Sequence, residues 1–373
     1  MKIAYLSADN PTDFISWSGL KLNIYKTLKS LKHDVLPIGP LRNVNRLPFV
    51  LKREFFKKIN IKYDSERKIS LSKNYSKRII TILKKQNIDL IFTSDTYLTS
   101  FLETDIPIIL WLDVTYKTYY NHYFDKKKFH KKSFQEANFL EKLALDKAKK
   151  IILTSYWSKK EKIKNYKIDP KKIHILPFGS NFKDNKKVNF NKQKKNNLNL
   201  ISVGVDWERK GMEKTINITK YLNKIGIDAK LNIIGGSKKK KFPNYIRQHG
   251  FLDKNKKKDY LILKKLFNNA DIHILMTSKE AAGVVFAEAN SFGLFNITND
   301  VGGVRGMINN NVNGKLFKVN SNPKKIADYI SEIFNDKKKF LKLKKNSYKY
   351  YEQKLSWHSN SKKVQKILLS VLN

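Results

Sequence analysis

The sequence predicts an α/β protein built from two doubly wound, Rossmann-like domains. Short β-branched runs alternate with helix-like stretches along all 373 residues, which is typical of βα units around a parallel sheet. Several of the runs are apolar at every position, as expected of strands that helices cover on both faces. A polar segment, 181–197, divides the runs into two series, and hydrophobic residues make up 41% of the chain, enough for two cores.

The predicted strands lie on both sides of that polar segment. The first series comprises Ile3–Ser7, Val35–Ile38, Leu90–Ser94, Ile108–Leu112, Ile151–Thr154 and His174–Pro177. The second comprises Leu198–Val203, Leu231–Ile234, Ile272–Met276 and Phe295–Thr298. We therefore expect an N-terminal domain over 1–180, a linker over 181–197 and a C-terminal domain over 198–350. A C-terminal helix within 351–373 is a candidate to pack back on the N-terminal domain.

Charge is the most unusual feature of the composition. The chain carries 76 Lys and Arg against 32 Asp and Glu, a formal net charge of +44, which by itself suggests a polyanionic partner. Only eight of these basic residues are Arg, the side chain that nucleic-acid readers favour, and 68 are Lys. We therefore interpret most of the excess as a general compositional bias and expect no nucleic-acid partner.

Several classes of protein are excluded by what the sequence lacks. The absence of cysteine rules out disulfides, thiolate metal sites and a cysteine nucleophile. The longest apolar run, Ile106–Leu112, is too short to span a bilayer, and the apolar stretch at the N-terminus is too short for a signal peptide. We therefore expect a cytoplasmic protein.

The most informative segment runs from Ser278 to Gly293. It follows a predicted strand and opens a predicted helix near Gly283, where backbone N–H groups form a ready phosphate site. Glu280 precedes this site, and Glu288 lies about a turn and a half inside the helix. A carboxylate accepts two hydrogen bonds at once, which suits the adjacent hydroxyls of a ribose or hexose. The alternative interpretation is an ordinary βα unit with two surface glutamates.

Three further segments place candidate residues after predicted strands. Gly204 ends one strand, and Arg209 with Lys210 follows at the entry to the next helix, where two cations could neutralise a diphosphate leaving group. Gly19 lies in the turn after the first strand, where a glycine can present backbone amides to an anion. Asp113 ends another strand and either orients an acceptor hydroxyl or caps the next segment. The alternative interpretations are an ordinary basic turn at Arg209 and Lys210, and an Asp113 that only caps the next segment, with no ligand at either place.

Taken in this order, the segments resemble the family 4 glycosyltransferases, retaining enzymes of the GT-B architecture. The family pattern of a Glu, seven residues and a second Glu, with Gly three after the first, is met by Glu280, Gly283 and Glu288. The family's phosphate loop is matched by Gly204, Lys210 and Gly211. Further matches are Ser18–Gly19, Pro177–Gly179, Val301–Gly303 and Gly314–Leu316. The resemblance implies two Rossmann-like domains that face a central cleft.

The resemblance also implies roles for the candidate residues. Arg209 and Lys210 would hold the donor diphosphate, Glu288 would bind the nucleotide ribose, and Glu280 would contact the transferred sugar. Val205 stands where many relatives have an arginine, and Arg209 is the candidate substitute. The other candidate donor-binding residues are Gly19, Gly204, Gly283, Val284, Val285 and Phe251, the last of them beside the base. Asp113 completes the candidate catalytic set.

The implied reaction moves a hexose from a nucleotide sugar to a glycan or a lipid-linked acceptor, in the synthesis of a surface polysaccharide or glycoconjugate. Retaining enzymes of this kind react on one face of the sugar, where the leaving phosphate helps to deprotonate the acceptor. No metal cofactor is expected, because cationic side chains take its place. Two alternatives remain: a soluble enzyme that makes a sugar phosphate or disaccharide and, less favoured, a basic nucleic-acid-binding protein.

The segment Leu51–Ile59 predicts a basic amphipathic helix. Leu51, Phe55 and Ile59 recur at helical spacing with cations between them, which suits an anionic membrane surface. The same spacing suits a helix packed on the sheet of the first domain, and the sequence slightly favours that packing. A peripheral contact with the inner face of an anionic membrane stays open as the second interpretation.

Overall fold

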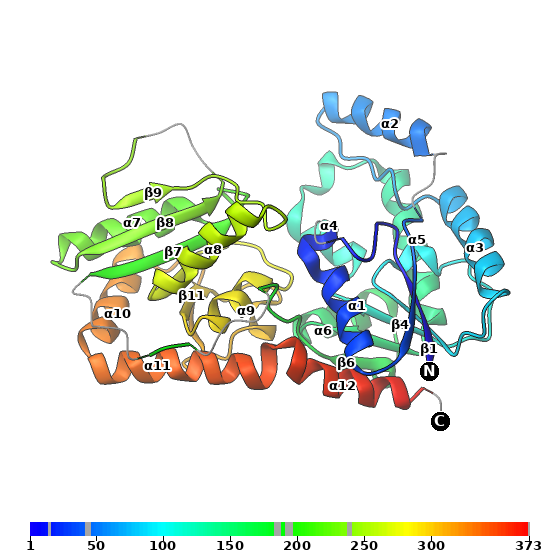
Figure 1. The fold of residues 1–373 in the computed structure, drawn as a ribbon. Helices are drawn as coiled ribbons and strands as arrows, with labels where there is room; N and C mark the ends of the chain where they lie inside the picture. The colour runs from blue at the N-terminus through cyan, green and yellow to red at the C-terminus, as the bar shows by residue number, and fades with distance from the viewer. Residues whose placement is uncertain (14–15, 42–45, 183–187, 191–196, 237–240, 372–373) are drawn as a thin grey trace. The chain divides into compact units, whose positions relative to one another are not determined.

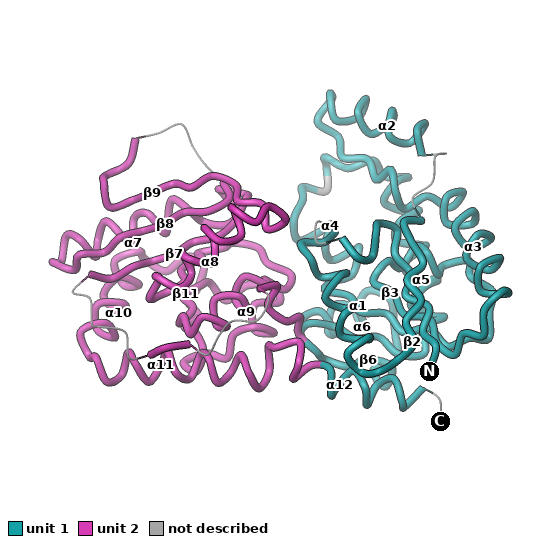
Figure 2. The backbone as a smooth tube through the Cα atoms, viewed as in Figure 1, with its two compact units in different colours: residues 1–176, 361–373 teal, residues 177–360 magenta. Residues whose placement is uncertain are grey.

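In the computed structural model, the chain forms two compact units (Figures 1 and 2). Unit 1 comprises Met1–Leu176 and Ser361–Asn373, and unit 2 comprises Pro177–Asn360. The structure describes the chain except for residues 14–15, 42–45, 183–187, 191–196, 237–240 and 372–373. The predicted linker therefore lies mostly outside the described residues. Each unit is described below by itself.

Unit 1 contains a six-stranded parallel sheet in the order β2-β1-β3-β4-β5-β6. Its strands are β1 (Lys2–Leu6), β2 (Asp34–Ile38), β3 (Leu90–Thr93), β4 (Ile108–Leu112), β5 (Lys150–Leu153) and β6 (Ile173–Ile175). Its helices are α1 (Leu20–Ser30), α2 (Leu47–Lys58), α3 (Ile69–Leu83), α4 (Tyr116–Tyr123), α5 (Lys131–Lys147) and α6 (Tyr156–Tyr166). The residues of β3 and β4 are all buried, because helices cover both faces of a parallel sheet.

Unit 2 repeats this architecture with the strand order β12-β11-β10-β7-β8-β9, again all parallel. Its strands are β7 (Leu198–Gly204), β8 (Ala229–Gly235), β9 (Ile246–Gln248), β10 (Ile272–Leu275), β11 (Phe295–Asn299) and β12 (Gly314–Phe317). Its helices are α7 (Met212–Lys224), α8 (Lys257–Asn269), α9 (Val284–Ser291), α10 (Pro323–Asn335) and α11 (Lys337–Tyr350). A π-helical stretch, Tyr351–Leu355, leads into α12 (Trp357–Leu369), within which the two units divide (Figure 2).

The strand orders place one topological switch point in each unit. In unit 1 the chain leaves β1 for β2 at the edge and then returns to β3 on the other side of β1. In unit 2 it proceeds from β7 to β8 and β9, and then returns to β10 on the other side of β7. In open α/β sheets, ligands bind beyond the carboxyl ends of the strands at such a point. The loops after β1 and β3, and those after β7 and β10, are therefore the places to look for a site.

All ten predicted strands are present, with ends that differ by at most two residues. The strands that the sequence missed, β9 and β12, lie at the two edges of the sheet of unit 2. β9 has the sequence Ile-Arg-Gln, and β12 begins at a glycine, so neither shows the continuous apolar pattern of a covered strand. Among the described helices, none has the length and apolar character needed to cross a membrane.

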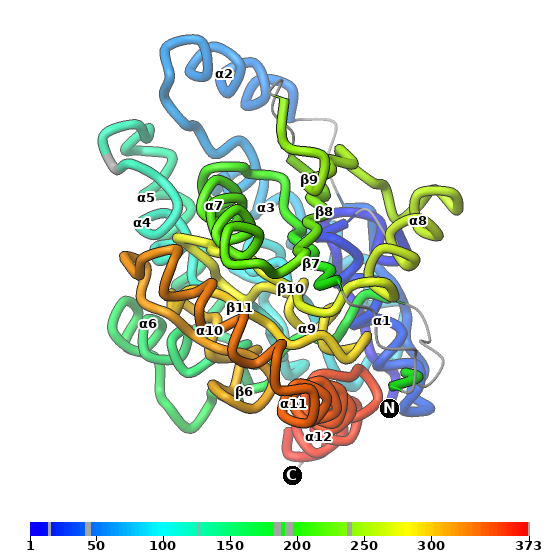
Figure 3. Tube along the Cα trace, turned by 90° about the vertical axis from the view of Figure 1, so that its left-hand side faces the viewer, coloured from blue at the N-terminus to red at the C-terminus, as the bar shows by residue number. Residues whose placement is uncertain are grey.

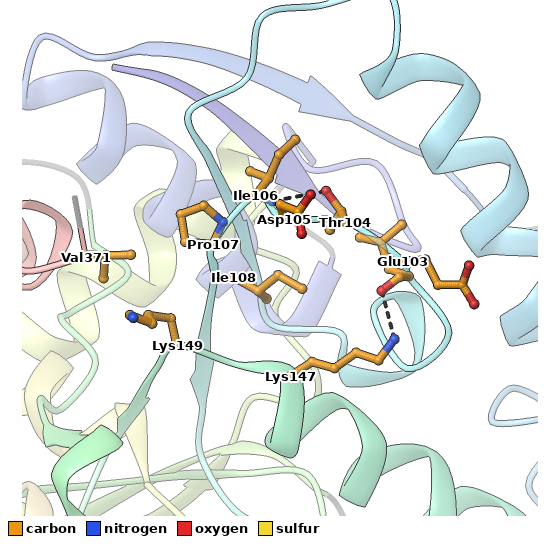
Figure 4. Close-up of a pocket in the computed structure, with 10 residues that line it drawn as sticks. Glu103, Thr104, Asp105, Ile106, Pro107, Ile108, Lys147, Lys149 and Val371 are labelled. Carbon is orange, nitrogen blue, oxygen red and sulfur yellow. Dashed lines mark hydrogen bonds between the residues drawn. The ribbon is translucent and has the colours of Figure 1, made fainter. Parts of the chain in front are cut away.

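A cavity of about 430 Å³ opens in unit 1 at the amino-terminal ends of β4 and β5 (Figure 4). Its lining includes Glu103, Asp105, Lys147 and Lys149, and Lys147 Nζ donates a hydrogen bond to the Leu102 carbonyl at 2.8 Å. This edge of the sheet is opposite to the carboxyl ends where the switch point lies. The cavity is therefore separate from the candidate site described below.

Candidate active site

The switch point of unit 2 brings together the loop after β7 and the loop after β10. The Ser278 amide donates a hydrogen bond to the Arg209 carbonyl at 2.8 Å, and the Thr277 hydroxyl donates to the same carbonyl at 3.1 Å. The loop after β11 joins them, because the Gly303 amide donates to the Glu280 carbonyl at 2.9 Å. Three strand-end loops are thus fixed to one another by backbone hydrogen bonds.

Two glycines allow this close approach. Gly211, the N-cap of α7, has a φ of 66°, and a Cβ there would lie 2.1 Å from the Met276 carbonyl oxygen. A Cβ on Gly204 would lie 2.7 Å from Cγ of Lys210. A side chain at either position would push the loop after β7 away from its neighbours. The glycines therefore set the position of the basic pair that lies between them.

That basic pair, Arg209 and Lys210, faces the carboxylate of Glu280. Lys210 Nζ donates a hydrogen bond to Glu280 Oε2 at 2.5 Å, and Arg209 Nη1 lies 3.9 Å from the same oxygen. The side chains of Lys210 and Glu280 are only 12% and 9% exposed. Arg209 is held in place from two sides, by the Lys279 carbonyl at 3.1 Å and by Asp206 Oδ2 at 3.1 Å. The result is a partly buried cluster of two cations and two carboxylates beyond the carboxyl ends of β7 and β10.

The N-terminus of α9 lies beside this cluster. Gly283 caps the helix with a φ of 75°, and a Cβ there would lie 2.6 Å from the Phe286 ring and 3.1 Å from Cγ of Glu280. The amides of the first helical residues, Val284 and Val285, have no acceptor within the helix, as at any helix start. The positive end of the α9 dipole and the two cations therefore favour the same kind of ligand, an anion.

Glu288, one turn further along α9, is almost completely buried, with a side chain 5% exposed. Its Oε1 accepts a short hydrogen bond from Lys254 Nζ, and Lys254 also lies over the Phe182 ring, 4.8 Å from its centroid. Lys254 comes from the segment between β9 and α8, which also carries Phe251, a residue 68% exposed to solvent. The structure thus brings the segment around Phe251 to the buried carboxylate of α9.

A network of buried polar side chains joins α9 to the neighbouring strands β10 and β11. Asn313 Nδ2 donates a hydrogen bond to Asn290 Oδ1 at 2.7 Å, and Asn290 Nδ2 donates to the Asn313 backbone carbonyl at 3.1 Å. Asn296 lies in the same network, and its Oδ1 is 2.7 Å from Nδ1 of the fully buried His273. These hydrogen bonds join α9 to β10, β11 and the turn before β12, while the buried Nε2 of His273 has no hydrogen-bond partner among the described residues. The network therefore fixes α9 and leaves one polar atom of His273 unsatisfied.

His273 makes this network sensitive to acid. Burial lowers the pKa of His273 from its ordinary 6.5 to about 4, with the Lys210 charge adding to the shift and the Asn296 hydrogen bond opposing it. Between pH 6.5 and about pH 4, His273 is protonated in the unfolded chain and neutral in the folded chain. The free energy of unfolding therefore falls as the pH falls below 6.5. We expect a loss of about 2 kcal/mol near pH 5 relative to neutral pH.

Denaturant unfolding of the wild type and of His273→Gln at several pH values measures this effect. The Gln side chain keeps a donor for Asn296 but has no proton to bind. The difference in unfolding free energy between the two proteins should shrink as the pH falls. A difference that stays constant from neutral pH to pH 5 would contradict the assignment.

Two sequence candidates, Gly19 and Asp113, lie in unit 1 and are described within that unit. Gly19 caps α1 with a φ of 86°, and Trp17 and Ser18 before it also have positive φ, at 50° and 57°. Such a run of left-handed residues is costly and persists where the surroundings hold it in place. Asp113 lies at the carboxyl end of β4, where its Oδ1 accepts a hydrogen bond from the Val114 amide at 2.6 Å.

The switch point of unit 1 holds an ion cluster that the sequence did not single out. Lys21 Nζ, on a side chain 5% exposed, donates to Asp95 Oδ2 at 2.7 Å and to Asp9 Oδ2 at 3.2 Å. Asp95 also accepts from the Ala8 amide at 2.8 Å, which ties the loops after β1 and β3 together. This arrangement is the counterpart, in unit 1, of the Lys210–Glu280 pair in unit 2.

Seven of the sequence candidates therefore gather at the switch point of unit 2 or on α9 above it: Gly204, Arg209, Lys210, Glu280, Gly283, Val284 and Val285. Glu288 joins them from the interior of α9, and Phe251 lies in the segment that contacts Glu288 through Lys254. Lys254 and Lys21 were missed because each is one lysine among 68 in the sequence. Within the part of the chain that the structure describes, no group of three or more His, Asp or Glu side chains could hold a metal ion.

A family model matches the part of the chain that contains this site. Residues 182–350 match the family model of the group 1 glycosyl transferases. The matched region includes every candidate residue of unit 2. A search of curated proteins finds no significant match.

Solved structures match over the whole length of the chain. Sucrose-phosphate synthase from Thermosynechococcus elongatus has a TM-score of 0.68 at 15% identity, with 100% of this chain and 99% of that one covered. HepE from Anabaena, in complex with UDP-glucose, has a TM-score of 0.65 at 15% identity and covers 99% and 100%. A glycosyltransferase from Rickettsia africae has a TM-score of 0.64 at 18% identity and covers 100% and 98%.

The chain has the GT-B fold. The likeness extends to both Rossmann-like domains and confirms the predicted fold class. At these sequence identities, the likeness to solved structures shows the fold alone.

Proposed function

We propose that the GT-B chain is a retaining glycosyltransferase that moves a hexose from a nucleotide sugar to a glycan or a lipid-linked acceptor. The observation that carries the proposal is the pairing of Lys210 with Glu280 at the N-terminus of α9, inside the region that matches the group 1 glycosyl transferases. HepE binds UDP-glucose with the same fold, which supports a nucleotide sugar as donor.

The donor diphosphate binds at the cationic cluster of unit 2. Lys210 pairs with Glu280, and a diphosphate supplies a stronger anion for Lys210 and Arg209 than one carboxylate does. The amides of Val284 and Val285 add donors that the helix does not use. Together these groups neutralise the charge that develops on the leaving diphosphate, which is the work that a metal ion does elsewhere. The proposed enzyme therefore uses no metal at this site.

Glu288 and Glu280 bind the two sugar rings of the donor. Glu288 is held in a single position by Lys254 and by burial, so its carboxylate is preorganised for the two hydroxyls of a ribose. The base then lies toward Phe251, which shares its segment with Lys254. Glu280 is released from Lys210 when the diphosphate binds, and its carboxylate then accepts hydrogen bonds from hydroxyls of the transferred hexose.

The transfer occurs on one face of the hexose. The bond from the anomeric carbon to the diphosphate oxygen breaks, and a bond from the same carbon to the acceptor oxygen forms on the same face. The acceptor proton moves to the departing phosphate oxygen, so that atoms and charge balance. Asp113, at a strand end of unit 1, is the residue that we assign to the acceptor hydroxyl.

A soluble enzyme that makes a sugar phosphate or disaccharide is the second candidate. It is favoured by the likeness to sucrose-phosphate synthase, which has the highest TM-score of the three structures described above. The two candidates share the donor chemistry and differ in the acceptor.

A transfer assay with radiolabelled nucleotide sugars tests the proposal. The wild type should transfer label from one of the UDP-, GDP- or ADP-sugars, and nuclear magnetic resonance of the product should show the anomeric configuration of the donor. Label in the lipid extract supports the first candidate, whereas label in a water-soluble sugar phosphate or disaccharide supports the second. An inverted product overturns the retaining mechanism, and a folded protein that transfers from none of these donors to either acceptor class overturns both.

A further inference from the structure

Helix α2 carries a continuous stripe of exposed apolar side chains. Leu47, Leu51, Phe55 and Ile59, which follows the last helical residue, are 63%, 61%, 61% and 52% exposed. Because they recur every four residues, they lie on one side of the helix, one above the other. None of the residues of α2 is fully buried. The packing of this stripe on the sheet, which the sequence slightly favoured, is therefore wrong.

A different side of α2 attaches it to unit 1. The Phe56 ring stacks on Tyr63, with centroids 5.5 Å apart, and lies 4.6 Å from the ring of His130. Phe49 is partly buried against the core of the unit. On the helical wheel Phe49 and Phe56 are adjacent to each other and lie on a different side from Leu47, Leu51 and Phe55. Figures 1 and 3 show α2 at the periphery of unit 1, away from the sheet. The helix is thus fixed by one side and presents the other to solvent.

Lysines lie next to the stripe. Lys52 lies at one border of the stripe and Lys58 at its carboxyl-terminal end, and both side chains are exposed. The acidic residue of the helix, Glu54, forms an ion pair with Arg53 at 2.8 Å, so its charge is largely neutralised within the helix. Large apolar side chains bordered by lysines are typical of a helix that lies in the interface of an anionic bilayer, with the apolar side among the acyl chains and the lysines at the headgroups.

We propose that α2 docks unit 1 on an anionic lipid surface, with the stripe Leu47, Leu51, Phe55 and Ile59 inserted and the lysines at the headgroups. The charge pattern argues against a second copy as the occupant. A symmetric contact through the stripe would bring the lysines of two α2 helices together, in chains that each carry a formal charge of +44. An anionic bilayer, in contrast, offers acyl chains to the apolar stripe and negative headgroups to the lysines beside it.

The inference deepens the proposed function, because a protein held at a bilayer reaches lipid-linked acceptors. The docking itself requires neither donor nor acceptor. A failure of membrane docking is therefore distinguishable from a failure of the donor chemistry. Docking is measured as binding to vesicles, whereas the donor chemistry is measured as transfer of labelled sugar.

Cosedimentation with lipid vesicles tests the proposal. The wild type should bind vesicles of phosphatidylcholine and phosphatidylglycerol in equal parts, should bind vesicles of phosphatidylcholine much more weakly, and should dissociate as salt is raised. The double substitution Leu51→Gln and Phe55→Gln should lower the vesicle partition coefficient at least roughly tenfold, because it removes two inserted side chains. Lys52→Gln with Lys58→Gln should lower it on the anionic vesicles alone.

Matched controls come from exposed residues of unit 2. Leu261 is 54% exposed on α8, and Leu261→Gln should leave vesicle binding unchanged. Lys338→Gln with Lys342→Gln, on exposed positions of α11, controls for the loss of two charges. Circular dichroism and thermal unfolding should show that every variant folds like the wild type, because all the substituted side chains are exposed.

Two results would overturn the proposal. One is that the stripe variant and its Leu261→Gln control bind anionic vesicles equally well, whether both bind like the wild type or both bind more weakly. The other is a dimer of the wild type, detected by light scattering, that the stripe substitutions dissociate while leaving vesicle binding intact. The second result would assign the stripe to a copy of the same chain.

Discussion

Replacing Lys210 by alanine should lower kcat/KM for sugar transfer about a thousandfold, equivalent to about 4 kcal/mol of transition-state stabilisation. Lys210 Nζ lies 2.5 Å from Glu280 Oε2, and both side chains have little access to solvent, so in the proposed reaction the lysine charge would stabilise the leaving diphosphate with little screening by water. Arg209 remains in the variant, but it lies further from that oxygen and is committed to Asp206 and the Lys279 carbonyl. The measurement is the initial rate of transfer from the radiolabelled donor as donor concentration is varied.

Lys214 provides the matched control for this substitution. It lies one turn into α7 from Lys210, and its Nζ donates to the Val319 carbonyl at 2.7 Å, away from the candidate site. Lys214→Ala should transfer at nearly the wild-type rate, and Lys210→Arg should keep part of the activity because the positive charge remains. If Lys210→Ala retained activity within tenfold of wild type while folding normally, the diphosphate site would have to lie elsewhere.

Replacing Glu288 by alanine should weaken donor binding at least about a hundredfold. Without the carboxylate, the ribose hydroxyls would lose two charge-assisted hydrogen bonds, each contributing roughly 1.5–3 kcal/mol. In addition, Lys254 would lose the buried carboxylate that holds it beside Phe182. Isothermal titration of the donor into the variant, compared with the wild type, gives the change in Kd.

Glu332→Ala serves as the control for Glu288→Ala. Glu332 forms an exposed ion pair with Lys339 on the helices α10 and α11, so its removal should change neither donor binding nor stability appreciably. Equal donor affinities for Glu288→Ala and the wild type would contradict the ribose assignment, provided that both proteins unfold at similar temperatures.

The sequence predicted the fold because its signal comes from local patterns. Continuous apolar runs such as Ile108–Leu112 and Ile272–Met276 are covered strands in the structure. The edge strands β9 and β12 gave no such signal, since a strand with one neighbour needs no continuous apolar run. The order of strands in each sheet, and hence the switch points, is a property of long-range pairing that no local pattern encodes.

The candidate site was predictable in part for the same reason. Arg209, Lys210, Glu280 and Gly283 follow two strands, and parallel strands place their following loops at one edge. The partners of these residues were not predictable. Lys254 reaches Glu288 from 34 positions away, and Lys21 reaches Asp95 from 74 positions away. The stripe on α2 shows a further limit, because helical spacing identifies an apolar face without saying what covers it.

We propose that unit 2 binds a nucleotide sugar at Lys210, Glu280 and Glu288. Isothermal titration of the wild-type protein with UDP-, GDP- and ADP-sugars in the absence of added metal tests it most directly. The structure leads us to expect saturable binding of one of these donors, and a higher unfolding temperature in its presence, because a ligand that binds the folded state stabilises it. Failure of the folded protein to bind any of the three, or equal binding by Lys210→Ala, would contradict the claim.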